Sequence, residues 1–300
     1  MKKFVTAIVA FAGVFSAFAD AIPTQNECWT LLRKNKLAEA EKGFRAIKDK
    51  GATPADRYIG INGMMYALRY QKKNTQVIAE VDKYLAEVTD ATNNQKAALY
   101  QFKGNAYRDL GKKDEAFATY KAGFEFKSTG NTSSDCAKEY IMLALNENKK
   151  DLAQNMYDLA SKEPASMKNI GFLINSAYLM WKTNQGEQGI KLLDDAEKIK
   201  HPAYLDETIH RYRGYLLRDN IKDYEKAVQA FEKALAVPGI SGTQKAVLWN
   251  NIGMVYEKDE EYEKAVEAFK KVGTFNAKGW FIKSAENSAK RLQKKIDAGE

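Results

Sequence analysis

The sequence predicts an all-α protein built from about seven helix–turn–helix units, and three observations support this fold class. First, one order of apolar, small and aromatic residues recurs along the chain, as is typical of repeat proteins. Second, Gly253 interrupts the helical pattern between Asn250 and Val272, and Ala265 follows it twelve residues later. Third, prolines stand between the predicted units, where a helix must end. No strand of useful length fits the remaining sequence.

The composition limits the classes of partner. The chain has 300 residues, of which 45% are hydrophobic, enough for a packed core and against disorder. Its formal net charge of +8 favours acidic partners, such as a nucleic acid, an anionic membrane surface or an acidic protein. The basic residues are interleaved with acids, and no basic tract resembles a phosphate-binding footprint. A nucleic-acid partner is therefore not expected.

Residues 1–19 have the pattern of a secretory signal peptide. Lys2 and Lys3 precede an apolar run from Phe4 to Phe18, and small residues precede a cleavage site before Asp20. An uncleaved membrane anchor is the alternative, but the run is short of the roughly 20 residues that a membrane span needs. We therefore expect an exported protein, periplasmic or extracellular, with no integral membrane span after cleavage.

The last unit defines the frame of the repeat. With Trp249 at position 4, the other patterned residues fall at positions 7, 8, 11, 17, 20 and 24: Ile252, Gly253, Tyr256, Tyr262, Ala265 and Phe269. This stretch resembles a tetratricopeptide repeat, a helix–turn–helix unit of about 34 residues. The resemblance implies a right-handed superhelical solenoid in which positions 8 and 20 are small, because the two helices of a unit press together there. We accordingly expect Gly253→Leu to cost about 1–3 kcal/mol through overpacking.

The same frame predicts the other units, in chain order, over residues 22–279. The first carries Cys28, Leu31, Ala40, Phe44 and Ile47; the second opens with Ile59, Gly63 and Tyr66 and then departs from the pattern. The third carries Tyr100, Gly104, Tyr107, Gly111, Ala116 and Tyr120, and the fourth Ile141, Ala144, Ala153, Tyr157 and Ala160. The fifth carries Leu173, Ala177, Met180, Gly189, Leu193 and Ala196. The sixth carries His210, Gly214, Ala227, Phe231 and Ala234, provided that its loop from Asp219 to Asp223 is one residue longer.

Prolines mark the junctions and a helix marks the end of the array. Pro54, Pro164, Pro202 and Pro238 all fall between predicted units. Residues 280–300 are predicted to form a C-terminal capping helix and tail, in which apolar residues alternate with lysines. The end of a solenoid requires such a polar outer face.

The sequence contains no catalytic constellation. Cys28 and Cys136 lie three units apart, too far for a disulfide, and Cys28 is expected to be a buried packing residue. His201 precedes a proline at a junction, and His210 takes the place of Trp249 in its unit. No Cys/His cluster has metal-ligand spacing, and no glycine loop is arranged to hold a phosphate. We therefore expect no enzymatic activity, no cofactor and no metal.

The resemblance also implies a binding groove, which the first helices of the units line mainly through positions 2, 5, 9, 12 and 13. The predicted groove residues are Asn105, Arg108, Lys138, Tyr178, Trp181, Arg211, Tyr215, Arg218 and Asn250. Aromatic side chains beside Arg and Lys are typical anchors of protein interfaces. The three aromatics are predicted to hold an apolar part of a ligand and the cations an acidic part. The alternative is that Tyr178 and Trp181 are buried between units.

This hypothesis makes a specific prediction for two arginines. We expect Arg211→Ala combined with Arg218→Ala to weaken an acidic ligand while leaving stability nearly unchanged.

The predicted function is protein–protein interaction, by an exported scaffold or adaptor that binds a protein or peptide, acidic in part, through its concave groove. One alternative is a structural subunit or assembly factor of an envelope or secretion complex, which would use the convex face or the ends. Another is a cell-wall or polysaccharide-binding module, in which aromatic rings stack on sugars. Exposed aromatics clustered in the groove favour the first function, and an apolar patch outside it favours the second. Coplanar aromatics along an open face favour the third.

Overall fold

The structure is a computed structural model that describes residues 22–275 and 277–299. Within these residues it contains fifteen α-helices and two short helical turns, and no strand. The first eight helices are α1 (Gln25–Arg33), α2 (Leu37–Lys50), α3 (Pro54–Tyr70), α4 (Asn74–Glu87), α5 (Asn93–Asp109), α6 (Lys113–Glu125), α7 (Thr132–Asn146) and α8 (Lys150–Ala160). A 3₁₀ turn η1 (Ser166–Lys168) precedes α9 (Ile170–Lys182), α10 (Gly186–Glu197) and α11 (Tyr204–Tyr215). A π-helical turn η2 (Leu216–Ile221) continues α11, and α12 (Tyr224–Leu235), α13 (Gly242–Lys258), α14 (Tyr262–Val272) and α15 (Trp280–Asp297) follow.

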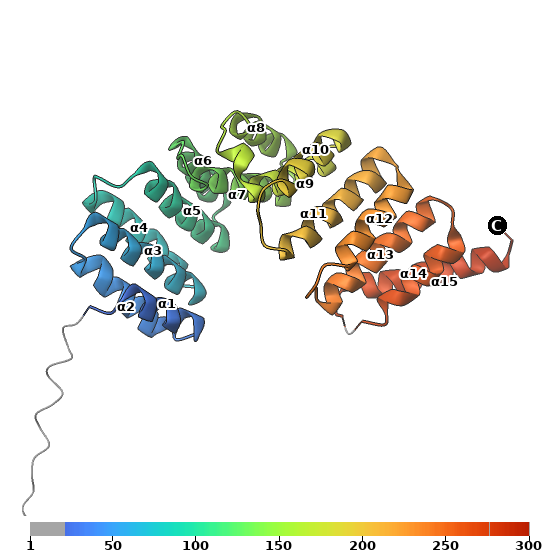
Figure 1. Ribbon diagram of the computed structural model, residues 1–300, viewed down its shortest axis with the longest axis horizontal. Coiled ribbons are helices and arrows are strands. Elements are labelled where there is room, and N and C mark those ends of the chain that lie inside the picture. The colour runs from blue at the N-terminus through green and yellow to red at the C-terminus, as the bar shows by residue number, and fades with distance from the viewer. Residues whose placement is uncertain (1–21, 276, 300) are drawn as a thin grey trace, which may run out of the picture.

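The helices form seven consecutive pairs and a final single helix, as the repeat frame predicts. The pairs are α1/α2 through α13/α14, and α15 packs against α14. The array is an arch in which α6, α8 and α10 run along the convex side and α7, α9 and α11 lie inside (Figure 1). The predicted signal peptide, residues 1–19, lies outside the described residues. None of the described helices is long and apolar enough to cross a bilayer.

Each turn between the two helices of a pair contains one left-handed residue. These residues, one per unit, are Asn35, Lys72, Gly111, Asn148, Asn184, Lys222 and Glu260. In six of the seven units, the following N–H donates to the carbonyl five residues back, as Lys112 does to Tyr107 at 2.9 Å. This bond closes the helix end and reverses the chain. The turn is therefore a structural repeat even where the side chains diverge.

The sixth unit differs by the one residue that the sequence predicts. There the bond joins the N–H of Asp223 to the carbonyl of Leu217, six residues back, at 3.0 Å. The extra residue does not loop out. It is absorbed as the π-helical turn η2, in which the helix widens from four-residue to five-residue hydrogen bonding.

A glycine in the first helix of three units faces an aromatic ring of the second helix. A Cβ atom on Gly104 would lie 2.5 Å from the ring of Tyr120, and one on Gly253 would lie 2.7 Å from that of Phe269. Gly214 faces Phe231 in the same way. The expected partner of Gly253 was Ala265; the space above Gly253 is instead filled by Phe269, while Ala265 is buried in the same core. The need for a small residue follows from the ring, not from Ala265.

The second unit departs from the pattern as expected, and the structure gives the reason. A Cβ atom on Gly63 would meet the ring of Phe44, which belongs to the preceding helix α2. One turn earlier, a Cβ atom on Gly60 would lie 2.2 Å from the backbone nitrogen of Lys48. Helix α3 is thus packed more closely against α2 than against α4.

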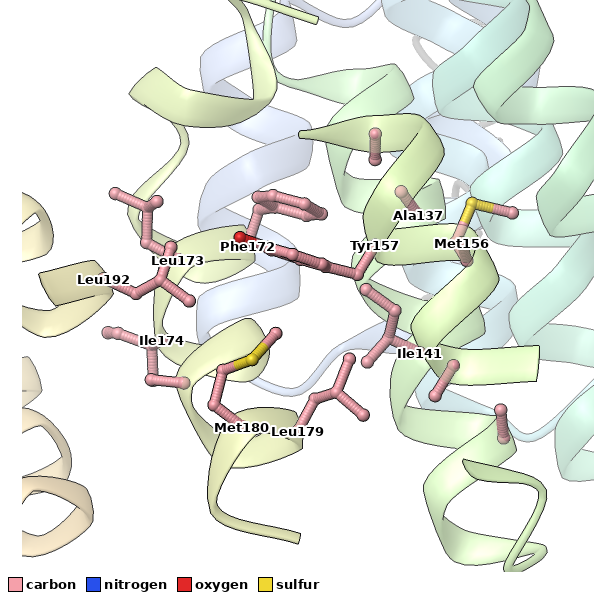
Figure 2. Close-up of a cluster of buried hydrophobic side chains, with 14 of the residues drawn as sticks. Ala137, Ile141, Met156, Tyr157, Phe172, Leu173, Ile174, Leu179, Met180 and Leu192 are labelled. Atoms are coloured by element: carbon pink, nitrogen blue, oxygen red, sulfur yellow. The ribbon is translucent and has the colours of Figure 1, made fainter. Parts of the chain in front are cut away.

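The buried core runs along the whole array and has no single centre. Figure 2 shows its middle, where Tyr157 of α8 and Phe172 of α9 stack with ring centroids 6.1 Å apart. Cys28 and Cys136 are buried, free thiols, and each lies against a glycine: Gly43 and Gly123. The burial of Cys28 was predicted. Each unit therefore depends on its neighbours to cover its apolar surface.

Candidate functional site

The inside of the arch is formed by the first helices of the units. Helices α5, α7, α9 and α11 follow one another there, and adjacent members of this row contact each other (Figure 1). Side chains from different units can therefore meet on this inner face. The predicted groove residues all belong to these helices, to η2 or to α13.

Four aromatic rings on α9 and α11, two helices of the inner row, contact one another and form what we call the aromatic cluster: Tyr178, Trp181, Tyr212 and Tyr215. The rings of Trp181 and Tyr215 stack with centroids 4.7 Å apart. Tyr178 contacts both Trp181, at 5.4 Å, and Tyr212, at 5.2 Å. Three of the four are partly exposed, and only Tyr215 is buried. Burial raises the pKa of Tyr178 and Tyr212, so both phenols remain neutral in the physiological range.

Cations surround the cluster. The ammonium of Lys182 lies 3.8 Å from the centre of the Trp181 ring and 5.3 Å from that of Tyr178. The guanidinium of Arg211 lies 5.0 Å from the Tyr212 ring, and that of Arg218 lies 5.5 Å from the Tyr215 ring. Each contact lies within the range of a favourable cation–π interaction.

Arg218 connects three units. Its side chain is 5% exposed, and its Nη1 donates to Oδ1 of Asn251 on α13 at 2.6 Å. It also donates through Nη2 to Oδ2 of Asp219 at 2.7 Å, and Nε1 of Trp181 donates to the same carboxyl oxygen at 3.0 Å. Partial burial acts to raise the pKa of Asp219, but the hydrogen bonds and charge of Arg218 outweigh it and hold that pKa below its usual value. The carboxylate therefore stays ionised.

Arg211 neutralises a buried acid. Its Nε donates to Oε1 of Glu207 at 2.7 Å, and the Glu207 side chain is only 3% exposed. An ionised carboxylate at such a depth requires a partner.

These contacts change the prediction made for the two arginines. Removing Arg211 would leave Glu207 buried without its cation, and removing Arg218 would leave Asn251 without its donor. We therefore expect substitution of either arginine to destabilise the fold, contrary to the expectation from sequence that stability would be nearly unchanged.

The remaining predicted residues lie on either side of the aromatic cluster. On α5, Asn105 is buried, and its Oδ1 accepts a hydrogen bond from the Tyr120 hydroxyl at 2.8 Å. Arg108 and Lys138 both pair with Glu139, at 2.8 and 3.7 Å. On α13, Asn250 is 8% exposed, and its Nδ2 lies 3.6 Å from Sδ of Met254.

The structure thus brings together five of the nine predicted residues: Tyr178, Trp181, Arg211, Tyr215 and Arg218. Sequence reasoning missed Tyr212, Glu207, Asp219 and Asn251, which complete this group. Tyr212 stands one place beyond the expected groove position 5, and Asp219 was assigned to a loop. The helical period could have identified Tyr212, because it lies three residues before Tyr215.

A second aromatic group, also missed, lies on the first helices of units one to three. Tyr66 on α3 contacts Trp29 on α1 at 5.5 Å and Phe102 on α5 at 4.9 Å. Tyr70, one turn beyond Tyr66, is 63% exposed. Aromatic side chains therefore occur along much of the row of first helices.

The two histidines contact neighbouring residues of the fold and belong to no cluster of catalytic or metal-binding side chains among the described residues. Nε2 of His201 lies 2.8 Å from Oδ1 of Asp206, and its Nδ1 contacts the carbonyl of Ile199, so the ring fastens a junction. Burial lowers the pKa of His210. Among the described residues, no group of three His, Cys, Asp or Glu side chains is arranged to hold a metal ion.

Comparison with known proteins supports the repeat frame. The family model for the tetratricopeptide repeat matches residues 97–129, 213–238 and 246–274. No curated protein sequence matches the chain. Many solved structures do, including a tetratricopeptide repeat protein from Parabacteroides merdae, with 16% identity and a TM-score of 0.53 over 88% of this chain and 96% of that one.

Two further structures are similar. The C-terminal part of a TPR repeat-containing protein from Cytophaga hutchinsonii has 15% identity and a TM-score of 0.55, over 88% of this chain and 99% of that one. Yeast Tom70 has 15% identity and a TM-score of 0.52, over 91% of this chain and 58% of Tom70. At such identities the similarity shows the fold alone.

Proposed function

Because this chain is a tetratricopeptide repeat protein, we propose that it is a scaffold or adaptor that binds a protein or peptide segment on its inner face. The aromatic cluster is the proposed anchor point. Repeat arrays of this kind present long concave surfaces that suit extended partners.

One observation supports this placement above the others: three of the four rings of the aromatic cluster, on two helices of the inner row, remain partly exposed, and cations lie beside them. Tyr, Trp and Arg are enriched among the residues that dominate binding energy at interfaces. A cluster whose rings already support one another is also pre-organised, so little side-chain freedom is lost on binding.

The charges narrow the chemistry of the proposed ligand. Arg108, Lys138, Arg211 and Arg218 each have a carboxylate partner within the chain. Lys182 forms no ion pair with any described residue, and its ammonium rests on aromatic rings. We therefore place one acidic group of the ligand at Lys182 and an apolar side chain on Tyr178 and Tyr212. The ligand therefore needs an acidic group at Lys182 and does not need to be acidic along its whole length.

We further propose that the protein acts outside the cytoplasm, in a periplasm or beyond. The support is the signal-peptide pattern of residues 1–19. Mass spectrometry of the protein from its native envelope fraction is expected to find Asp20 as the first residue. A chain that retains Met1 would contradict export by cleavage.

The test is chemical crosslinking and pull-down from the native envelope fraction with three forms of the protein. The inner-face variant is Lys182→Glu/Met254→Glu; Met254 is 36% exposed and lies 3.8 Å from Arg218. The control replaces one lysine and one exposed apolar residue by glutamate on the outer helices α6 and α8, as Lys121→Glu/Leu159→Glu. We expect the inner-face variant to capture about tenfold less of a partner, or less still, than the parent does, and the control to capture as much as the parent. Equal capture by all three forms would refute the inner-face site.

One observation favours a second candidate, assembly through the convex side. On α8, Leu152 and Leu159 are 37% and 51% exposed and lie seven residues apart, on one face of the helix. If the control variant loses the partner and the inner-face variant keeps it, a structural or assembly role through α8 replaces the scaffold role.

Polysaccharide binding has less support. Sugar platforms require open ring faces, whereas Trp181 and Tyr215 stack on each other with an interplanar angle of 26°.

A further inference from the structure

The final helix presents an exposed face on which the charged residues are all basic. Along α15, residues spaced by three or four positions form what we call the α15 basic face: Trp280, Lys283, Asn287, Lys290, Arg291 and Lys294. All six are exposed. The two acids of this helix, Glu286 and Asp297, lie along one edge of the face and not within it.

Other exposed helix faces mix the two signs of charge. On α14 the exposed residues alternate as Glu263, Lys264, Glu267 and Lys270, and on α12 as Glu225, Lys226, Glu232 and Lys233. Interspersed charges are typical of a surface that only needs to be soluble. A capping helix needs polarity but not a single sign, so solubility does not explain the α15 basic face.

The cations of this face are mostly unneutralised. Arg291 pairs with Glu257 at 2.5 Å, whereas Lys283, Lys290 and Lys294 form no ion pair with any described residue. Part of the face is hollowed into a depression of about 700 Å³, lined by Asn287, Lys290, Arg291, Lys294, Lys295 and Ala298. Its lining is suited to anionic oxygens.

A large aromatic ring stands at the N-terminal end of the same face. The Trp280 side chain is 81% exposed, the most exposed of the large hydrophobic residues described. Its ring touches that of Phe281 edge-on at 6.3 Å. Keeping an indole in water is unfavourable, and Trp is enriched where membrane meets water, because one end of its ring is apolar and the other polar.

We propose that the α15 basic face docks this end of the array onto an anionic phospholipid surface, with the lysines at the lipid phosphates and Trp280 in the interfacial layer. A protein partner would have to supply an apolar pocket and carboxylates in register over the roughly 17 Å from Lys283 to Lys294. A bilayer supplies an apolar layer and anionic phosphates everywhere on its surface. Helix α15 lies at one end of the arch, so docking there leaves the inner face open (Figure 1). The inference is independent of the proposed function.

The test measures co-sedimentation of the full chain with vesicles of neutral phosphatidylcholine, and with vesicles that contain about 30% phosphatidylglycerol, at low and high salt. The test variant is Lys283→Gln/Lys290→Gln/Lys294→Gln. The matched control is Lys121→Gln/Lys150→Gln/Lys191→Gln, which removes the same charge from exposed positions on α6, α8 and α10. All forms share residues 1–21, so any binding by that segment is common to them and does not affect the comparison between the variants.

We expect the parent to prefer the anionic vesicles and to be released by salt. Each cation near such a surface raises the partition coefficient onto anionic vesicles about fivefold. The test variant is therefore expected to bind these vesicles about a hundredfold more weakly than the parent, and the control less than about fivefold more weakly. Brominated anionic lipid is expected to quench the parent's tryptophan emission, and Trp280→Phe to abolish that quenching, because Trp29, Trp181 and Trp249 lie on other helices.

Three results would overturn the proposal. One is an equal loss of binding to anionic vesicles in both triple variants, which would show that binding depends on the overall charge of the protein and not on the α15 basic face. Another is parent binding that does not depend on lipid charge. The third is a change in Trp280 emission when soluble polyglutamate is added, with no change when anionic vesicles are added. This result would indicate that the face binds an acidic protein.

Discussion

Substituting Gly253 by Leu tests the contact that defines the repeat. A Cβ atom at residue 253 would lie 2.7 Å from Cδ1 and Cε1 of the Phe269 ring. Carbon atoms in contact normally lie about 3.5–4.0 Å apart, so the first added atom alone overlaps the ring by about 1 Å. The ring is 2% exposed and enclosed by α13, α14 and α15, which leaves it little room to retreat.

Two opposing effects set the magnitude. Leucine favours the helix over glycine by roughly 0.8 kcal/mol. Overpacking costs typically about 1–3 kcal/mol, and this site lies at the upper end because four carbons enter a filled space. The expected net loss in the free energy of unfolding is about 1–2 kcal/mol.

A double-mutant cycle makes the test specific. Phe269→Ala alone is expected to cost about 3–5 kcal/mol, because it opens a cavity. In Gly253→Leu/Phe269→Ala the leucine refills part of that cavity, so the double variant is expected to be more stable than Phe269→Ala. The coupling between the two substitutions is then at least about 1 kcal/mol.

Urea unfolding followed by circular dichroism gives the global change, and hydrogen exchange in α13 and α14 locates it, since repeats transmit stability mainly to their neighbours. Gly242→Leu is the matched control, because a Cβ atom at that exposed end of α13 meets nothing closer than 3.8 Å. If Gly253→Leu unfolds like this control, or if the two substitutions at 253 and 269 are additive, the proposed packing is wrong.

Three further outcomes are expected. Arg211→Ala should lower the free energy of unfolding by about 3 kcal/mol in urea titrations, because Glu207 loses its cation, with a smaller loss for Arg211→Lys; equal losses would exclude the ion pair as the cause. The bond to Asp206 raises the pKa of His201 above 6.5, so its stabilisation should be complete below pH 6.5 and vanish as pH rises through the folded-state pKa; the difference in melting temperature between parent and His201→Gln should shrink over that interval. Burial raises the pKa of both thiols, so Cys28 and Cys136 should react with a thiol reagent only after unfolding.

The repeat could be predicted because its signal is steric and local. Gly104 and Gly253 each precede an aromatic residue by sixteen positions, and Gly214 precedes Phe231 by seventeen, which reveals the longer turn. A glycine does not say which helix presses on it, however. For Gly63 the ring comes from the preceding helix, through Phe44, and no spacing within unit two contains that fact.

The aromatic cluster was predictable only in part. Tyr178 and Trp181 share a helix face by the 3.6-residue period, and the repeat frame places Tyr215 at the corresponding position of the next unit. The contacts between units were not predictable, since they depend on how far neighbouring helices are displaced. The cations illustrate this: their spacing predicts charges free for a ligand, but all four predicted cations are paired with acids from the same or adjacent helices.

The extra residue of unit six connects these observations. Without it, α11 would end one residue earlier and its turn would close as in the other units. With it, η2 continues the helix far enough for Arg218 to reach Asn251 in unit seven, and for Asp219 to reach Trp181 in unit five. Asn220 adds a bond from its Nδ2 to the carbonyl of Trp181 at 3.3 Å. One π-helical turn thus ties three units together and contacts the aromatic cluster through Asp219, Asn220 and Arg218. Widened helical turns are frequent at functional sites, and this one supplies a hydrogen-bond acceptor to the Trp181 ring and a cation beside the Tyr215 ring.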